Sequence, residues 1–457
     1  MHMKGIITRL IIILILAGLL GGGVYYMFFM DKDLRDLGYT AAEIEKLRTY
    51  KITDKVKTYN PGLIAALNSE DFIEENLDYY IHIHANTDVT KDINDLAKTY
   101  TIQEVESLSE VLKPQDLYSL VFCDRISNIE LYKQYYRKGY DYQTSVTLTN
   151  DLDAQYSRTL MELPMMEYKE VMAYMDYAAK GYSPQFLAYF YNNYEPEDFI
   201  AFRTISYFPA FEGLLQEEGF RFERLARYIW HMNRYQTSAA IAIANINDDY
   251  DVPDSVDYSD FYDSSKTITV TDPLTVLVNK ERRLPADYVP ENLEEIAGEY
   301  RDSNEPLIKE AREAFEEMAK AYSKDHSTPI ISYSGYISYD DQKVLYENRL
   351  AQLDGNAAEL DRIMGKEGCD EHQTGLAVSI TEKGTIAYDF DETAACKWVK
   401  ENCQDYGFIL RYPKDKDYLT GYAANDYQYR YVGTDAARII KKFNWCYEEY
   451  YYLFIEH

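Results

Sequence analysis

Between about residues 31 and 253, apolar residues recur at intervals of three and four positions. This period gathers apolar side chains on one face of a helix, so we expect the region to be mainly helical. Two stripes carry the pattern: Ile102, Val105, Leu108, Val111 and Leu112, and then Phe211, Leu214, Leu215, Phe220 and Leu225.

The expected helix boundaries also recur. Glycine followed by tyrosine and a capping residue marks a helix end and the next start in 38–40, 139–141 and 181–183. Proline in a first turn opens helices at Pro114 and Pro196. The same four-residue motif, Tyr-Gln-Thr-Ser, occurs at 142–145 and at 235–238, near the expected end of two units. We therefore predict about three tyrosine-rich helical repeats, with brief strands at 146–148 and 241–243 closing two of them.

Past Asp254 the pattern changes to short strands and turns. A helix is predicted from about Glu305 to Ser323, with Leu307, Ala311, Phe315, Met318 and Ala319 on one face. The sequence thus predicts a connecting segment at 254–303 and a separate mixed domain at 304–457. The whole chain is expected to be of the α+β class.

The N-terminus reads as a membrane anchor. Lys4 and Arg9 precede an uncharged run from Leu10 to Met30, long enough as a helix to cross a bilayer core of about 30 Å. The positive residues before it predict a cytoplasmic segment at 1–9 and a single-pass protein whose bulk lies outside the cell membrane. A cleaved signal peptide is the alternative, because Ala17 and Gly18 are small, but the apolar run continues beyond them.

Composition narrows the function. The 77 acidic and 47 basic residues give a formal charge of −30, which argues against nucleic-acid binding. The five cysteines show no metal-ligand spacing. The 47 tyrosines either pack helices together or form surfaces that contact sugars and proteins.

Short sequence motifs in the C-terminal part of the chain resemble those of a known family. They include Ser334-Gly335-Tyr336, Glu371-His372-Gln373-Thr374-Gly375, Tyr406-Gly407-Phe408 and Tyr429-Arg430-Tyr431-Val432-Gly433. In this order they resemble the VanY-type D-alanyl-D-alanine carboxypeptidases, which are zinc peptidases of the LAS type. The resemblance covers about the last 185 residues. It implies a LAS-type antiparallel sheet with flanking helices, and a site where zinc holds a water molecule, a carboxylate takes its proton and an arginine meets the substrate.

Most of the residues that this resemblance implies are replaced. His372 stands at the first ligand position, but Ser379 and Gln428 stand at the other two. Asn425 replaces the general base, and Ile337 replaces the arginine. No cofactor is therefore expected, although the family would use zinc. Asp370 and Glu371 directly precede His372 in the sequence, and Asp426 directly follows Asn425. These three residues could supply substitute carboxylates for a rewired metal site.

We therefore predict a pseudopeptidase that binds peptidoglycan stem peptide or a cell-wall protein without cleaving it. Two alternatives stay open: an active metallo-carboxypeptidase with substitute ligands, and an interaction scaffold that works through the helical repeats. The candidate groove residues are Tyr336, Gln342, His372, Gln428, Tyr429 and Arg430.

Overall fold

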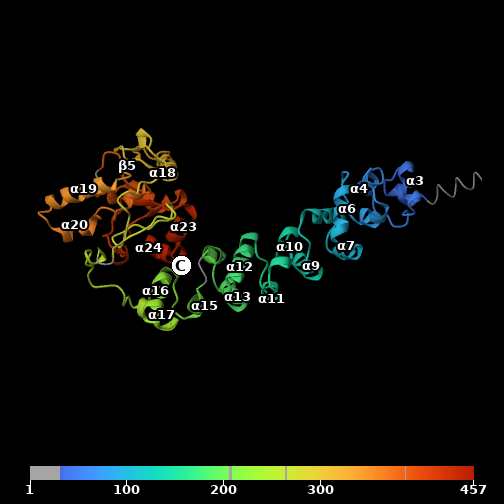
Figure 1. Cartoon of the computed structure of the whole chain (residues 1–457), viewed down its shortest axis with the longest axis horizontal. Helices are drawn as coiled ribbons and strands as arrows, with labels where there is room; N and C mark the ends of the chain where they lie inside the picture. Colours follow the sequence, from blue (N-terminus) through green and yellow to red (C-terminus); the bar gives the residue numbers. More distant parts are fainter. Residues whose placement is uncertain (1–30, 205–207, 263–264, 386, 457) are drawn as a thin grey trace, which may run out of the picture. The chain divides into compact units, whose positions relative to one another are not determined.

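The chain is helical from residue 32 to residue 247 and contains both helices and strands thereafter (Figure 1). The structure is a computed structural model that describes residues 31–204, 208–262, 265–385 and 387–456. It forms two units, Met1–Ala178 and Ala179–His457. The predicted anchor at 10–30 lies outside the described residues. Among the residues that are described, no helix is both long and apolar enough to cross a membrane.

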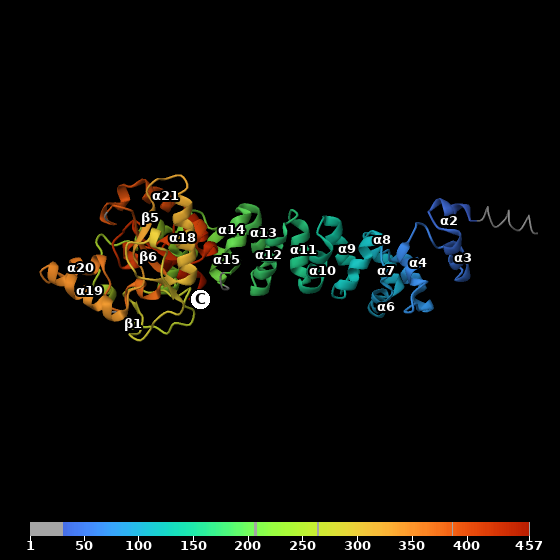
Figure 2. The same cartoon turned by 90° about the horizontal axis from the view of Figure 1, so that it is seen from above.

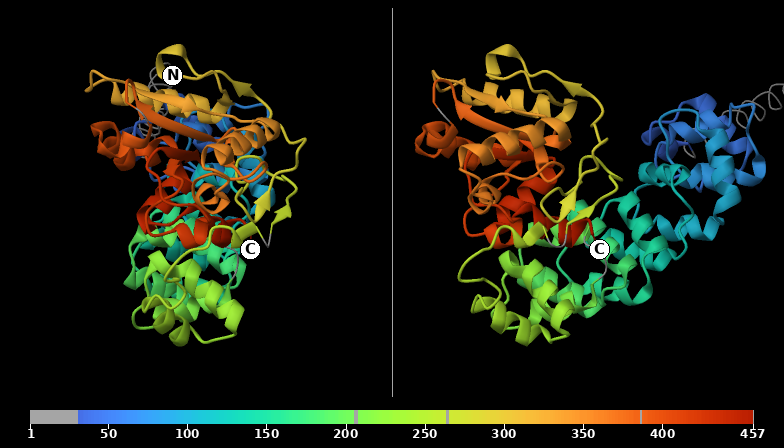
Figure 3. Two further views of the ribbon diagram at one scale, coloured as in Figure 1. Left: turned by 90° about the vertical axis from the view of Figure 1, so that its left-hand side faces the viewer. Right: turned by 60° about the vertical axis from the view of Figure 1, so that its left-hand side comes forward.

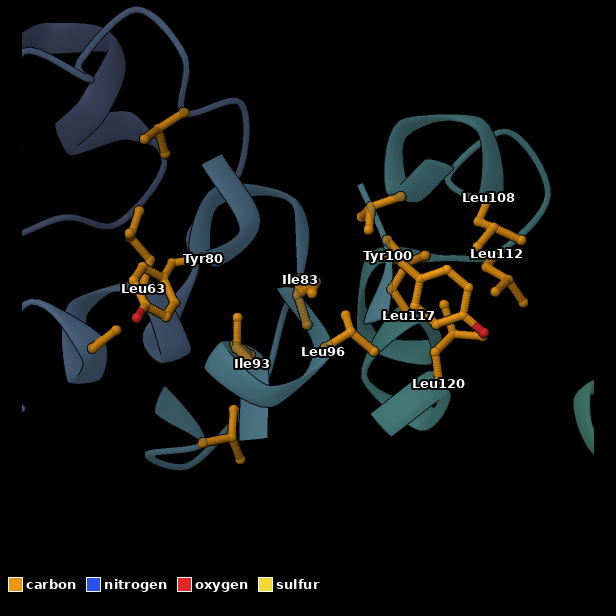
Figure 4. Close-up of a cluster of buried hydrophobic side chains, with 14 of the residues drawn as sticks. Leu63, Tyr80, Ile83, Ile93, Leu96, Tyr100, Leu108, Leu112, Leu117 and Leu120 are labelled. Atoms are coloured by element: carbon orange, nitrogen blue, oxygen red, sulfur yellow. The ribbon is translucent and has the colours of Figure 1, made fainter. Parts of the chain in front are cut away.

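The N-terminal unit is built from short helices around a core of leucine, isoleucine and tyrosine. Figure 4 shows part of this core, where Leu96 lies near Ile83 and Tyr100 lies among leucines. The helices are α2 Lys32–Asp36, α3 Ala41–Thr49, α4 Pro61–Ala66, α5 Leu77–His82, α6 Thr90–Thr99, α7 Ile102–Leu108, α8 Pro114–Leu117, α9 Ile129–Lys138, α10 Tyr142–Asp151, α11 Ala154–Glu162 and α12 Tyr168–Lys180, which runs past the end of the unit.

The predicted capping residues begin helices. Thr40 and Asp141 each accept a hydrogen bond from the backbone three residues later, at the starts of α3 and α10. Ser183 does the same at the start of α13, Pro184–Asn193. Gly139 ends α9 with φ at 117°, which a side chain would disfavour. These local signals were sufficient to predict the helix starts.

Tyrosines placed just before capping residues make one recurring contact. Each lies in the interior, with less than 5% of its surface exposed, and its hydroxyl binds the backbone of a later loop. The hydroxyls of Tyr39, Tyr100, Tyr140 and Tyr182 accept hydrogen bonds from the backbone N–H of Asn60, Ile126, Met166 and Phe208, at 2.8, 2.7, 3.5 and 3.1 Å. In each case a buried phenol fastens a loop that lies beyond the next one or more helices. These tyrosines pack helices together rather than face a ligand.

The predicted strands at 146–148 and 241–243 are wrong, because both segments are helical. Residues 146–148 lie inside α10, and residues 241–243 lie inside α17, Ala239–Asn247. Asp141 and Ser238 cap these helices. Three alternating residues are too few to distinguish a strand from a helix, and the cap before each run decides the outcome.

In the C-terminal unit, the last helices before the connecting segment pack on the C-terminal domain. These helices are α13, α14 Pro196–Ala201, α15 Pro209–Gln216, α16 Leu225–Tyr235 and α17. The rings of Phe202 and Phe222 stack at 4.8 Å, and both lie within 5.2 Å of the Phe443 ring. The indole N–H of Trp445 donates to the carbonyl of Phe222 at 3.2 Å. The compact unit therefore begins at Ala179, whereas the sequence placed the domain boundary after residue 253.

The C-terminal domain holds a four-stranded antiparallel sheet in the order β5-β6-β8-β7. Figure 2 shows α18 running beside β5 and β6. Val378, Ile380 and Tyr429 lie on the buried face and pack in one core with Phe315 of α18 and Val399 of α21. The strands are β5 Ile330–Ser334, β6 Ala377–Glu382, β7 Phe408–Leu410 and β8 Gln428–Tyr431. The helices are α18 Lys309–Tyr322, α19 Tyr339–Gln352, α20 Ala357–Ile363, α21 Ala394–Asn402, α22 Asp417–Thr420, α23 Thr434–Phe443 and α24 Tyr447–Phe454.

The helix predicted at 305–323 is α18, which begins at Lys309. Its predicted apolar face is buried at Ala311, Phe315, Met318 and Ala319. Leu307 instead belongs to β4, Leu307–Ile308, which pairs with β3, Leu293–Glu294. Two further short strands, β1 Lys266–Thr267 and β2 Arg282–Arg283, pair in parallel within the connecting segment.

Lys280 fixes this connecting segment to the domain. Its side chain is fully buried, and its ammonium group lies over the rings of Tyr258, Tyr262 and Tyr422 at 5.4, 5.3 and 4.6 Å. The ammonium donates to the carbonyl oxygens of Tyr258, at 3.0 Å, and of Asp361 in α20. Burial lowers the pKa of Lys280 to about 8.

This lowered pKa predicts a pH-dependent contribution to stability. Between pH 8 and its ordinary pKa, Lys280 holds fewer protons in the folded chain than in the unfolded chain. Folding therefore becomes more favourable with rising pH in this window. We expect the unfolding free energy of the wild type to increase, relative to that of Lys280→Met, from pH 7.5 to pH 9.5 in urea titrations. A difference between the two proteins that does not change with pH would contradict this role.

Candidate functional site

The sheet brings together the three positions at which the family resemblance places metal ligands. Ser379 of β6 lies directly opposite Gln428 of β8 in the strand register. Both project from the face opposite Val378 and Tyr429, because side chains alternate along a strand. The imidazole Nε2 of His372 lies 3.0 Å from the Ser379 hydroxyl. The positions are adjacent as expected, and all three side chains are more than 90% buried.

A short turn holds His372 in place. The 3₁₀ turn Glu371–Thr374 ends at Gly375, whose φ of 69° favours glycine, and a Cβ there would lie 2.9 Å from Leu293 Cδ2. The Thr374 hydroxyl donates to the carbonyl of Glu371 at 2.6 Å and closes the turn. The His-x-x-Gly spacing therefore serves the backbone geometry that aims His372 at β6.

Asp370 sets the orientation of the imidazole. Its carboxylate accepts hydrogen bonds from the backbone N–H of His372 at 2.9 Å and from ring Nδ1 at 2.7 Å. Burial alone would raise the pKa of the Asp370 carboxyl, but His372 beside it holds that pKa below its ordinary value. Nδ1 donates to the Asp370 carboxylate, and Nε2 shares a hydrogen bond with the Ser379 hydroxyl. Both ring nitrogens are thus engaged within the domain.

The donor set does not suit zinc. Protein zinc sites use histidine, cysteine and carboxylate ligands, whereas this one offers an imidazole, a neutral hydroxyl and a neutral amide. Across the ranges that the structure describes, no group of three or more His, Cys, Asp or Glu side chains could hold a metal ion.

Asn425 and Ile337, which stand at the positions of the general base and the substrate-binding arginine, make hydrogen bonds that involve the backbone. The Asn425 carboxamide oxygen accepts the backbone N–H of Gln428 at 3.0 Å, which shapes the turn into β8. The backbone N–H of Ile337 donates to the carbonyl of His372 at 3.3 Å. The carboxamide of Asn425 cannot take up a proton as a carboxylate base would. Ile337 has no charge with which to bind a substrate carboxylate.

The proposed substitute carboxylates have other partners. Asp426 lies 2.7 Å from the ammonium of Lys400 in α21, and Asp370 binds His372 through the nitrogen away from Ser379. Glu371 is fully buried and binds Arg411 and Arg430 at 2.9 and 2.8 Å. None of the three completes a ligand set with His372.

Three of the candidate groove residues are buried in the interior of the domain. Gln342 is 3% exposed and donates to the carbonyl of Gly365 at 2.7 Å. Tyr429 is fully buried in the core under the sheet, and Arg430 is fully buried beside Glu371. Tyr336 is partly exposed, with its backbone N–H bound to the carbonyl of Pro306 at 2.8 Å. Of the six candidates, His372 and Gln428 lie at the site itself.

The main feature that sequence reasoning missed is a buried ion network behind the His372 turn. The carboxylate of Glu371 binds the two guanidinium groups of Arg411 and Arg430, and Arg411 also binds Glu448 of α24 at 2.6 Å. Arg430 donates to the carbonyl of Val276 at 2.9 Å. The network ties the turn to the C-terminal helix and to the connecting segment. The available signal was two arginines, Arg411 and Arg430, each flanked by apolar or aromatic residues in the sequence.

The C-terminal part of the chain is similar to known proteins. A sequence profile of the VanY family, described as D-alanyl-D-alanine carboxypeptidase, matches residues 304–434. YodJ of Bacillus subtilis (strain 168) is 36% identical over 196 residues, which are 41% of this chain and 71% of YodJ. A D-alanyl-D-alanine carboxypeptidase of Enterococcus faecium is 36% identical over 149 residues, which are 33% of this chain and 45% of that protein.

A solved structure of a VanY D,D-pentapeptidase, from a VanB-type resistance cassette and in complex with Zn(II), is 30% identical. The match covers 39% of this chain and 99% of that one, with a TM-score of 0.35. The matched family profile covers residues 304–434, and residues before 304 lie outside it.

Proposed function

Since the chain belongs to the VanY family of D-alanyl-D-alanine carboxypeptidases, we propose that it is a member that binds peptidoglycan stem peptide, or a cell-wall protein, without cleaving it. The family processes cell-wall peptidoglycan, so a retained fold with altered chemistry points to recognition. The proposal includes a single membrane anchor in the uncharged sequence Leu10–Met30, with the rest of the chain on the cell-wall side.

The observation that carries the proposal is the hydrogen bond between His372 and Ser379, with Gln428 opposite. Hydrolysis by a metallopeptidase needs a metal-bound water and a base. Here the imidazole nitrogen that would meet a metal is hydrogen-bonded to a serine hydroxyl at 3.0 Å. The amide of Asn425 at the base position cannot take a proton at neutral pH. The carboxamide Nε2 of Gln428 has no hydrogen-bond partner among the described residues, so it can donate to a bound peptide.

The test measures cleavage and binding on the same full-length protein. We expect no release of D-alanine from a pentapeptide ending in D-Ala-D-Ala, with or without added Zn²⁺, together with saturable binding of that peptide by calorimetry. The matched control is the same peptide ending in L-Ala-L-Ala, which should bind more weakly. Zinc-dependent release of D-alanine would overturn the proposal. Absence of peptide binding would leave a cell-wall protein as the ligand.

A further inference from the structure

A cavity of about 470 Å³ opens on the C-terminal unit, away from the His372 site. Its walls come from α16, the connecting segment with β1 and β2, and α24. Figure 3 shows the light-green helices of residues 208–247 lying against the red C-terminal segment. We propose that this cavity binds a neutral pyranose sugar. Ile337, His372, Ser379 and Gln428 do not line it, so this inference goes beyond the proposed function.

Aromatic faces supply the apolar part of such a site. Trp230, Tyr418, Tyr451 and Tyr452 line the cavity. Trp230 keeps 41% of its surface exposed and makes an edge contact with Tyr235, which is 52% exposed. The C–H face of a pyranose ring is apolar and flat, so an exposed indole can stack against it. Large aromatic side chains with a polar edge suit a ligand that is apolar on one side and hydroxylated on the other.

Most of the charges that line the cavity have partners within the protein. Ion pairs join Asp251 to Arg227, Glu448 to Arg411, Glu449 to Lys416, and Glu456 to Arg282. A charged ligand would have to compete with these pairs, and breaking a partly buried pair is costly. A neutral ligand that only donates and accepts hydrogen bonds leaves them intact. The electrostatics therefore favour a sugar over a phosphate, a carboxylate or an amine.

Polar groups in the cavity are held in fixed positions. The guanidinium of Arg282 lies 4.8 Å from the centre of the Tyr451 ring and donates to the hydroxyl of that same residue at 2.8 Å. Because this hydroxyl accepts from Arg282, its own proton remains to be donated to a ligand. Arg227 lies over the ring of Tyr418 at 5.7 Å. Sites that are formed before binding lose less entropy on binding a ligand.

The experiment uses the full-length protein and the β-1,4-linked trisaccharide of N-acetylglucosamine as probe. We expect saturable one-to-one binding by calorimetry, weakened about tenfold by Trp230→Ala, a loss of about 1.4 kcal/mol, because the indole face that stacks on the sugar is removed. Tyr451→Phe, which removes only a hydroxyl, should weaken binding severalfold. The matched control is Tyr250→Ala, because Tyr250 is 76% exposed and does not line the cavity.

Circular dichroism of each variant separates loss of the site from loss of the fold. Weakened binding by a folded Trp230→Ala protein, with unchanged binding by Tyr250→Ala, supports the sugar site. No binding of the trisaccharide by the wild type, or equal binding by all variants, overturns it. Binding of the peptide Ala-Lys-Ala with the same sensitivity to Trp230→Ala, in the absence of trisaccharide binding, also overturns it in favour of a cationic ligand.

Discussion

The double variant Ser379→Asp, Gln428→His is expected to bind one Zn²⁺ per chain, with an affinity at least about 100-fold above that of the wild type. The reason is geometric. Ser379 and Gln428 face each other across β6 and β8, and Nε2 of His372 already points at position 379 within 3.0 Å. Two exchanges would therefore complete a ligand set of two imidazoles and a carboxylate. Calorimetry with ZnCl₂ on the full-length chain measures the gain.

A second readout separates a formed site from a lost fold. The new carboxylate would stand at a position that is 3% exposed, where an unpaired charge is unfavourable. The double variant should therefore melt below the wild type in a chelator and recover in zinc. The matched control is Ser379→Asn, Gln428→His, which has the same shape without the charge. A folded double variant that binds no better than this control would show that the strand register does not preserve the ligand geometry.

Removing the charge of Glu371 is expected to destabilise the C-terminal unit by about 3–5 kcal/mol. Glu371 is the shared partner of Arg411 and Arg430, and all three side chains are fully buried. The variant Glu371→Gln keeps the size of the side chain but leaves two guanidinium groups without their common counter-ion. The midpoint of urea unfolding should fall accordingly.

Tryptophan fluorescence reports this change in the right part of the chain. The sequence has three tryptophans, and Trp230, Trp398 and Trp445 all belong to the C-terminal unit. The matched control is Asp405→Asn, which breaks an ion pair with Arg438 whose side chains are 54% and 60% exposed. This change should cost less than about 1 kcal/mol. Similar midpoints for both variants would mean that the buried network contributes little to stability.

Local features of the fold could be predicted from the sequence. The helix starts at Thr40, Asp141 and Ser183 depend on a side-chain oxygen and the next turn of backbone, so neighbouring residues determine them. The unpredicted start at Thr101 follows the same rule, with a capping box to Glu104, but no glycine precedes it. The strands expected at 146–148 and 241–243 are wrong because an alternation of only three residues does not distinguish a strand from a turn of helix.

Features that join distant residues could not be predicted in this way. The family words placed His372, Ser379 and Gln428 at one site, and the strand register agrees. The ion network joins Glu371 to Arg430, 59 residues later, and no local pattern relates the two. The same holds for the boundary at Ala179, which depends on contacts between the rings of Phe202 and Phe443.

These ring contacts also constrain the order in which the chain can fold during synthesis. The partners of Phe202 and Phe222 include Phe443, Trp445 and Phe454, which come more than 200 residues later in the chain. The helices from Pro184 to Asn247 must therefore keep apolar rings uncovered until these later residues have been synthesised. The N-terminal unit has its own core and can close earlier. Loss of the final helix would thus trap the C-terminal unit in an aggregation-prone state.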